Sequence, residues 1–437
     1  MRPTHRAAFV ILFGALFLFV ALVFDPRLWA IWIAYVVGAA VLGGLDAVWT
    51  IPARQISIEW DIPDTLHIGR DETMTVRIQT VQWARSVRGE VLIDLGDLLQ
   101  SVPVHRIVIA PDLTESIDIV LSPTRRGATV VKRVWLRWTG PMGFTQQITR
   151  RDIDHSVAII PNIRAVRESA LRFAIQREYL SGVKAMQYVG DGSEFDSLKE
   201  YVPGLDHRAI NWRATARHRK LLCQEFRAER DQQVIIALDT GHLMSEPMAG
   251  IPKLDHAINA GLLLSYACLH TGDRVGLFGF DSTIRLFREP RGGLRIFPDL
   301  QRAATDLTYD DSETNFTLGI TELATRLRRR SLIVILTDFV DTITAQLMVE
   351  NIGRLARRHL IVLVTLRDPT LEHLAKEPPS SLSQLHRSVV ATDFISERNA
   401  VILRLKKLGV HTLDAPPQGV SVQLLNRYLE IKRRELV

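Results

Sequence analysis

The chain contains little cysteine and lacks the short motifs of several enzyme classes. Among its 437 residues are two cysteines, Cys223 and Cys268, and neither lies in a CxxC pair or in a metal-binding spacing. The sequence has no GxxxxGKS/T phosphate-binding loop, no GxSxG nucleophile motif and no HExxH motif. The sparse cysteine fits a reducing compartment. Because no catalytic motif is present, we predict that the protein is not an enzyme.

Neither sign of charge dominates the composition. Charged residues make up 23% of the chain and apolar residues 47%, and the formal net charge is +6. These values are typical of an ordinary globular protein. The small positive excess fits nucleic acid, an anionic membrane surface and an acidic protein partner equally well, so the net charge does not select among them.

The first 50 residues contain two long apolar stretches. Residues 7–24 carry no charge, and a second stretch runs from residue 28 to about residue 45. Eighteen residues rise ~27 Å as a helix, close to the ~30 Å hydrocarbon core of a bilayer. Asp25-Pro26-Arg27 between them favours a turn. We predict a transmembrane helical hairpin over residues 1–55, rather than a signal peptide followed by a buried helix, because no small-x-small cleavage site precedes Asp25.

The distribution of arginine predicts the orientation of this hairpin. Arg2 and Arg6 precede the first span and Arg54 follows the second, whereas the connecting loop carries Arg27 balanced by Asp25. Positive residues favour the cytoplasmic side of a membrane. We therefore predict a protein of the cytoplasmic (inner) membrane with two transmembrane helices and its soluble part in the cytoplasm.

Two domains of different class are expected after the hairpin. Residues 56–160 alternate apolar and polar residues in short runs separated by turn residues, which predicts a small antiparallel β-sandwich or barrel. Residues 161–232 form a connector and a charged segment. In residues 233–437, continuous apolar strands alternate with helical patterns, which predicts a doubly wound α/β domain with a parallel sheet. Sites in such sheets form at the carboxyl ends of the strands.

The charged segment, residues 193–230, is the most informative part of the chain. Arginines here, such as Arg213 and Arg217, suit phosphate contacts, and Trp212 suits stacking on a base. The alternative is a solvated surface whose charges pair with neighbouring carboxylates such as Glu225. Because a membrane anchor argues against nucleic acid, we predict no nucleic-acid partner and interpret the segment as a surface for protein recognition.

Three polar residues of the α/β domain, Asp239, Thr314 and Asp338, resemble the metal site of von Willebrand factor type A domains. That family has Asp-x-Ser-x-Ser after the first strand, a Thr in a middle loop and an Asp after a later strand, and such hard oxygen ligands hold Mg²⁺. Here Gly241 and Leu243 stand where the family has its serines. The resemblance implies a degenerate site, which is either a weakened Mg²⁺ site or a decayed one whose residues cap helices and turns. No other cofactor is predicted.

A longer resemblance runs through residues 193–226. The order Ser-Glu-Phe, Tyr-x-Pro-Gly, Arg-x-Ile-x-Trp, Ala-Arg and Glu-Phe resembles the signature of the bacterial domain-of-unknown-function family number 58. The chain departs from that pattern at Leu205 and at Ala228, while residues 140–144 resemble the family's Asp-Pro-Phe-Gly-Leu. The matching residues are Ser193, Glu194, Phe195, Leu198, Glu200, Tyr201, Pro203, Gly204, Asp206, Arg208, Ile210, Trp212, Ala214, Ala216, Arg217, Glu225 and Phe226.

This resemblance implies a partner. Members are typically encoded beside MoxR-type AAA+ ATPases and are thought to act with them, which implies a membrane-anchored adaptor in protein assembly or maturation. Two alternatives stay open: a Mg²⁺-dependent adhesion-type binding module that uses Asp239, and an enzyme that acts on cell-envelope precursors. The residues expected to contact the partner are Glu194, Tyr201, Asp206, Arg208, Trp212, Arg213, Arg217 and Arg227.

Overall fold

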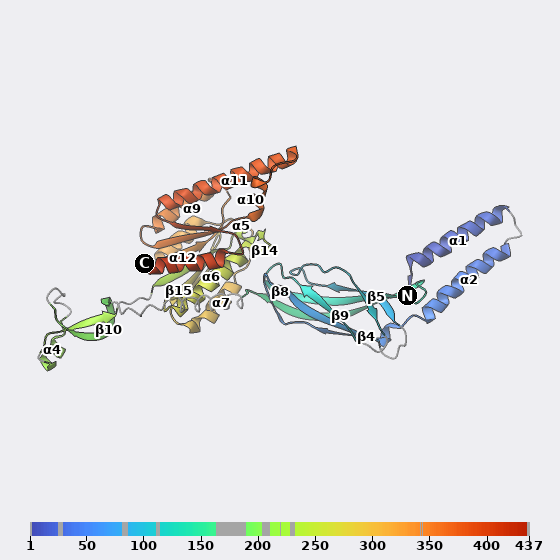
Figure 1. Cartoon of the computed structure of the whole chain (residues 1–437), viewed down its shortest axis with the longest axis horizontal. Helices are drawn as coiled ribbons and strands as arrows, with labels where there is room; N and C mark the ends of the chain where they lie inside the picture. The colour runs from blue at the N-terminus through green and yellow to red at the C-terminus, as the bar shows by residue number, and fades with distance from the viewer. Residues whose placement is uncertain are drawn as a thin grey trace. The chain divides into compact units, whose positions relative to one another are not determined.

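The chain divides into two units, Met1–Asn162 and Ile163–Val437, which are described separately (Figure 1). The computed structural model describes residues 2–24, 29–80, 86–110, 114–162, 189–202, 210–218, 220–227, 232–340, 342 and 344–434. All statements below concern these residues.

The first unit begins with two antiparallel helices, α1 (His5–Phe24) and α2 (Trp29–Val48), of 20 residues each. The indole of Trp32 donates to the Ala15 carbonyl at 3.3 Å, and the Tyr35 hydroxyl donates to the Val10 carbonyl at 2.6 Å. Gly14 permits this contact, because a Cβ there would collide with the Tyr35 ring. By length and composition one helix, Trp29–Gln55, is able to cross a membrane. The second span stays a prediction.

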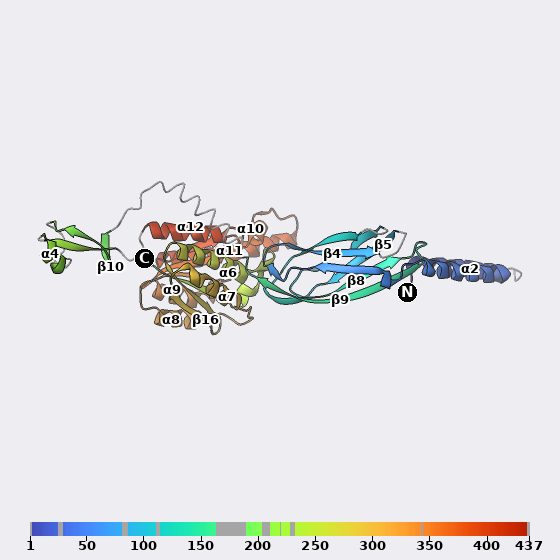
Figure 2. The same cartoon turned by 90° about the horizontal axis from the view of Figure 1, so that it is seen from below.

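The rest of the first unit is built from β-strands. One sheet has the order β1-β9-β8-β5-β6 with β3 beside β9, and the other has the order β2-β4-β7. All pairs are antiparallel except β3 with β9. Figure 2 shows these strands along the length of the β unit. Their bounds are β1 Arg2–Pro3, β2 Ile56–Asp61, β3 Thr65–His67, β4 Glu72–Thr80, β5 Val87–Asp94, β6 His105–Ile109, β7 Thr114–Leu121, β8 Gly127–Thr139 and β9 Thr145–Ile160.

The alternation seen in the sequence produces one buried face per strand. In β4, Met74, Val76 and Ile78 are fully buried, whereas the residues between them are at least partly exposed. Successive side chains of a strand point to opposite faces, so this pattern places every second residue in the core. The predicted antiparallel β region is therefore confirmed.

A single loop, residues 140–145, holds both helices to the β-strands. The carboxylate of Asp46 near the end of α2 is fully buried and accepts hydrogen bonds from the backbone N–H groups of Met142 (2.7 Å), Phe144 (2.9 Å) and Thr145 (2.7 Å). At the start of α1, Thr4 donates from its N–H to the Phe144 carbonyl at 2.9 Å. A Cβ at Gly140 would lie 2.6 Å from both Asp46 oxygens, so this approach requires glycine.

The second unit opens with a small hairpin. β10 (Val189–Glu200) pairs antiparallel with β11 (Leu222–Arg227), and the short helix α4 (Trp212–His218) lies between them in the chain. This hairpin contains the described part of the charged segment.

The remainder of the second unit is a six-stranded sheet in the order β16-β15-β12-β17-β18-β19. β16 is antiparallel to β15, and the other neighbours are parallel. The predicted parallel sheet is confirmed. Its strands are β12 Gln233–Asp239, β15 Arg274–Phe280, β16 Ile284–Arg291, β17 Leu332–Leu336, β18 Leu360–Leu366 and β19 His411–Ala415, and a short β13 Pro247–Met248 pairs with β14 Ile251–Pro252.

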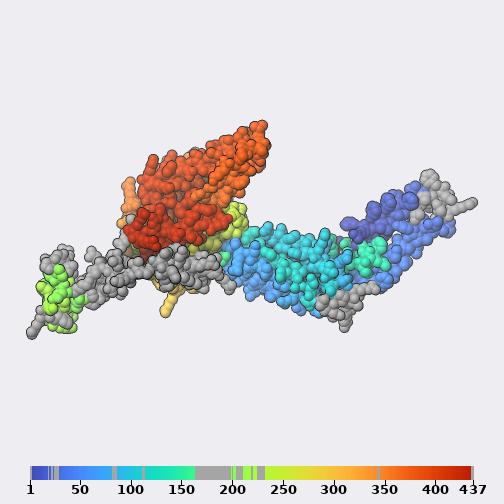
Figure 3. Space-filling view, viewed as in Figure 1, coloured from blue at the N-terminus to red at the C-terminus, as the bar shows by residue number. Residues whose placement is uncertain are grey.

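Helices cover both faces of this sheet. Alternate residues of β12 enter two different cores: Val234, Ile236 and Leu238 pack with residues of α6, α7 and α12, whereas Ile235 and Ala237 pack with residues of α8, α9 and α11. The start of α11 and the neighbouring α10 project from the surface of the unit (Figure 3). The helices are α5 His242–Ser245, α6 Lys253–His270, α7 Phe297–Thr305, α8 Phe316–Arg326, α9 Thr344–Leu355, α10 Pro369–Lys376, α11 Leu382–Lys407 and α12 Val420–Arg433.

A buried polar cluster fastens α12 to the turn before β15. The Lys432 ammonium lies 2.7 and 2.8 Å from the two carboxylate oxygens of Asp273, which is fully buried and also accepts from the Tyr428 hydroxyl. Burial raises the pKa of the nearby Cys268 thiol, so this thiol stays protonated and unreactive.

Candidate functional site

The parallel pairing of β12 with β17 brings two aspartates to one edge of the sheet. Leu238 lies opposite Leu336, so Asp239 at the end of β12 lies beside the residues that follow β17, including Asp338. Asp239 and Asp338 are 1% and 6% exposed. Two carboxylates in such surroundings need hydrogen bonds or positive partners.

Asp239 obtains its partners from hydroxyl groups and from the backbone. One carboxylate oxygen accepts from the Thr314 hydroxyl at 2.6 Å and from the Gly241 N–H at 2.9 Å, and the other accepts from the Thr337 hydroxyl at 2.5 Å. Burial raises the pKa of Asp239 to about 6, although these hydrogen bonds act in the opposite direction. The structure thus joins two of the three predicted ligands, Asp239 and Thr314.

Asp338 instead lies between two positive side chains. One of its oxygens is 2.8 Å from the Lys253 ammonium and the other is 2.6 Å from the Arg398 guanidinium. Lys253 also contacts Glu246 at 2.7 Å. Burial lowers the pKa of Lys253, but Asp338 and Glu246 outweigh this effect, so the pKa lies above its ordinary value and the ammonium stays charged.

Arg398 extends this network across the sheet edge. Its guanidinium also donates to the Leu366 carbonyl at the end of β18 at 2.8 Å and lies 3.3 Å from the Asp414 carboxylate on β19. It lies over the ring of Phe339, 5.0 Å from the ring centroid. Sequence reasoning missed Lys253, Arg398 and Thr337, because each becomes a partner only when separate elements pack together.

These side chains do not fit a divalent cation. Both oxygens of Asp338 are occupied by cationic groups, and Gly241 and Leu243 supply no side-chain oxygen. A Cβ at Gly241 would collide with the Thr314 hydroxyl, so the space that a serine needs is filled. Within the described residues, no group of three or more His, Cys, Asp or Glu side chains is placed to hold a metal ion.

A cavity of about 470 Å³ opens beside this network. Its walls combine apolar side chains, such as Leu371 and Phe394, with the charged groups of Arg398 and Asp414. Pockets of this size with a few polar groups among apolar walls suit a side chain or a small ligand.

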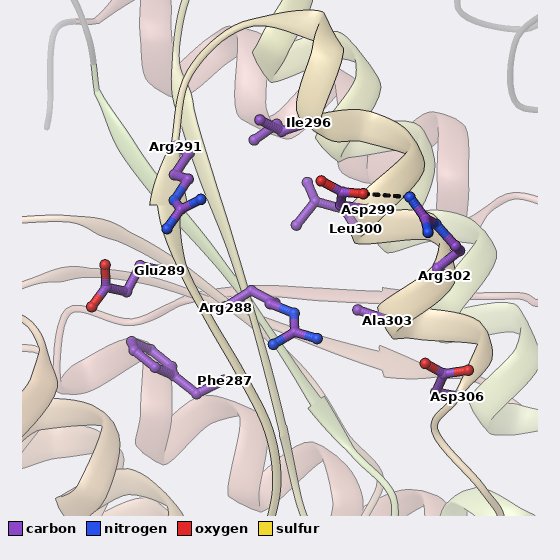
Figure 4. Close-up of a pocket in the computed structure, with 10 residues that line it drawn as sticks. All are labelled: Phe287, Arg288, Glu289, Arg291, Ile296, Asp299, Leu300, Arg302, Ala303 and Asp306. Carbon is purple, nitrogen blue, oxygen red and sulfur yellow. Dashed lines mark hydrogen bonds and ion pairs between the residues drawn. The ribbon is translucent and has the colours of Figure 1, made fainter.

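A second hollow lies between β16 and α7, and none of the predicted site residues lines it (Figure 4). Its volume is about 690 Å³. Arg288 and Arg291 extend from the strand, and on the helix Asp299 pairs with Arg302 at 2.6 Å. Positive and negative groups are mixed on its walls, so the hollow shows no selective charge.

The predicted partner-binding residues fall into four groups. Trp212 begins α4 with 69% of its surface exposed, and Arg213 and Arg217 on the same helix are exposed. Tyr201 is half-buried. Glu194 and Arg227 lie opposite each other in the β10–β11 register. The remaining two, Asp206 and Arg208, lie outside the described residues.

Local hydrogen bonds hold α4 in place. The Asn211 side chain accepts from the Ala214 N–H at 3.0 Å, which caps the helix, and the Thr215 hydroxyl accepts from the Leu222 N–H at 3.0 Å. The Asn211 N–H donates to the Leu222 carbonyl at 2.8 Å. These contacts use neither Trp212 nor the arginines.

Comparison with known proteins supports one family. Residues 197–400 match the model of the family described as "Protein of unknown function DUF58". Uncharacterized proteins of Mycobacterium bovis (Mb1516) and Mycobacterium tuberculosis (Rv1480) are 24% identical over 187 residues, which is 41% of this chain and 56% of theirs. The chain thus spans about half the length of these curated relatives. The match supports the resemblance predicted from residues 193–226 and adds no activity.

Two solved structures each resemble about a quarter of the chain. A mutant alpha-2-macroglobulin of Salmonella is 12% identical and covers 24% of this chain and 7% of its own, and the CARDB domain of the PF1109 protein of Pyrococcus furiosus is 11% identical and covers 24% and 94%. The TM-score is 0.19 in both cases. Likeness at this level carries no argument about function.

Proposed function

We propose that the protein is a non-enzymatic adaptor, anchored in the cytoplasmic membrane by α1 and α2, with a soluble part in the cytoplasm that binds proteins. The apolar helix Trp29–Gln55 supports the anchor. The strand order of the sheet and the placement of Asp239 beside Thr314 support a likeness to von Willebrand factor type A domains, which act in binding.

The observation that carries this proposal is the exposure of Trp212. A tryptophan with 69% of its surface in water leaves a large apolar area without a core to cover it. Tryptophan and arginine are the side chains that most often dominate the binding energy of protein interfaces. Trp212, Arg213 and Arg217 therefore form a recognition surface on α4, and their positive charge favours an acidic partner.

The proposed partner is a MoxR-type AAA+ ATPase, which follows from the family resemblance. The alternative of a Mg²⁺-dependent adhesion module requires open carboxylate oxygens at the strand ends. Because those of Asp338 are held by Lys253 and Arg398, that alternative is disfavoured. The alternative of a cell-envelope enzyme has no nucleophile–base pair among the described residues to support it.

The test is recovery of the partner from native membranes. We expect affinity-tagged full-length protein to recover a MoxR-type ATPase, and Trp212→Ala to lower this recovery about tenfold, as for a hot-spot residue worth over 1 kcal/mol. Trp60→Ala is the matched control, because Trp60 is a partly exposed tryptophan on β2 in the first unit, whereas α4 belongs to the second. Wild-type protein that recovers no ATPase with or without ATP would overturn the proposal.

A further inference from the structure

We infer that Lys253 and Arg398 take the place of a divalent cation at the strand-end site, so that the protein itself neutralises the carboxylates there and the site works without metal. This inference concerns the site alone and does not depend on the identity of the partner.

The first observation is the position of Lys253. It is the first residue of α6, and its side chain is only 10% exposed, with the ammonium 2.8 Å from Asp338 and 2.7 Å from Glu246. A positive charge in the first turn opposes the helix dipole, so helix stability does not explain a lysine there. Its contact with two carboxylates does, because an ammonium is a compact charge with three donors.

The second observation is the reach of Arg398. Its guanidinium contacts Asp338 after β17, the Leu366 carbonyl at the end of β18 and Asp414 on β19. Three successive strand ends are thus tied to one cation. Joining separate loops through their oxygen atoms is what a bound metal ion does in a protein site.

The third observation is the closure of the space around Asp239. Gly241 has no side chain, and the Thr314 hydroxyl lies where a Cβ at position 241 would stand. Thr314 and Thr337 donate their protons to Asp239, so their oxygens face the carboxylate as donors rather than as metal ligands. The site is therefore built around internal hydrogen bonds and internal cations.

We expect Lys253→Ala to have an unusual effect. Removal of the ammonium leaves the buried Asp338 and the adjacent Glu246 without a shared partner, which destabilises the fold. It also opens a space lined by carboxylate oxygens, which a hard divalent cation fills. The substitution should therefore create a metal site that the natural chain lacks.

The experiment measures Mn²⁺ binding to full-length protein in detergent by electron paramagnetic resonance, together with melting temperature. We expect wild-type protein to bind no Mn²⁺ and to melt at the same temperature in Mn²⁺ and in EDTA. Lys253→Ala and the bulkier Lys253→Met should melt lower in EDTA, and Mn²⁺ should raise the melting temperature of Lys253→Ala by mass action. Lys253→Met, whose side chain fills the space, should gain less.

The matched control is Lys432→Ala, which removes a partly buried ammonium from Asp273, where no second carboxylate of the described residues is bonded to it. It should be destabilised without rescue by Mn²⁺. Stoichiometric Mn²⁺ binding by wild-type protein would overturn the inference. A folded Lys253→Ala protein that gains no Mn²⁺ affinity would overturn it as well, and if that variant does not fold, the wild-type measurement still decides.

Discussion

At the scale of single residues, Asp239 shows how burial and hydrogen bonding compete. Three donors surround its carboxylate, yet the pKa is raised to about 6 because the group is fully buried. The free-energy cost of removing a carboxylate from water is larger here than the stabilisation that these neutral donors provide. The neighbouring Asp338 is instead paired with two full positive charges, those of Lys253 and Arg398.

The raised pKa predicts a pH dependence of stability. A folded-state pKa above the unfolded value of 3.8 gives stability that is present below pH 3.8 and is lost as the pH rises to about 6. Asp239→Asn does not titrate. We therefore expect the difference in unfolding free energy between wild type and Asp239→Asn to change by about 3 kcal/mol across this window and to be flat above it.

Urea unfolding of full-length protein in detergent, followed by tryptophan fluorescence from acid to neutral pH, checks this prediction. Thr314→Val serves as a control, because loss of a hydrogen bond that lowers the pKa should shift the window to higher pH. A difference that stays constant from acid to neutral pH would show that burial does not dominate at Asp239.

The residues of this site differ in how far the sequence predicts them. Asp239 and Asp338 end continuous apolar runs, and parallel strands place such ends together, so their position could be predicted. Lys253 and Arg398 lie in helices with no local pattern that distinguishes them from solvated charges. Their role arises only when α6 and α11 pack near the same strand end, a tertiary event that periodicity does not encode.

At the scale of elements, loop 140–145 determines how the helices join the β-strands. Its backbone N–H groups converge on Asp46 and form an anion-binding concavity. Thr50 and Thr145 share a further hydrogen bond of 3.1 Å at the same junction. The end of α2 and the β8–β9 connection are therefore one structural piece.

We predict that Asp46→Ala destabilises the first unit by roughly 3 kcal/mol or more, because each buried N–H left without an acceptor costs about 1–3 kcal/mol. Hydrogen–deuterium exchange should rise first in residues 140–145. Asp46→Asn keeps one acceptor oxygen and should lie in between. The exposed Asp118, which accepts from Thr75 at 2.8 Å, provides the control variant Asp118→Ala, with little effect expected. Equal effects of Asp46→Ala and Asp118→Ala would contradict the proposed role of Asp46 in joining α2 to loop 140–145.

In the second unit the sequence predicts the central strands, but it does not predict the edge strand β16 or the helix α7. The central strands and α6 follow from their apolar pattern. The edge strand β16 was not predicted, because its Arg-rich sequence with Pro290 is typical of protected edges and carries no period-two signal. The start of α11 at Leu382 could not be predicted either, since its first turns are exposed and lack an amphipathic pattern.

At the scale of the whole molecule, the helix Trp29–Gln55 is long and apolar enough to cross a membrane, and we predict that α1 and α2 cross it together. Each has 20 residues, and ~1.5 Å per residue gives about 30 Å, the thickness of the hydrocarbon core. Their side-by-side packing through Gly14 and Tyr35 is typical of helices that associate closely in lipid. Asp46 at the end of α2 is satisfied by loop 140–145, so it presents no bare charge to the bilayer.

These features predict that both ends of the chain lie on the cytoplasmic side. Arg2, Arg6 and Arg54 flank the spans on that side, and the buried thiols of Cys223 and Cys268 are free, as suits a reducing compartment.

Green fluorescent protein fused after Val437 should therefore fluoresce, and alkaline phosphatase inserted after Arg27 should be active. Replacing Arg2 and Arg6 with Glu should weaken this preference, because it removes positive charge before the first span. If alkaline phosphatase fused after Val437 were active, the chain would have the opposite orientation. The recognition surface on α4 would then face away from cytosolic ATPases, and this result would refute the proposed partner too.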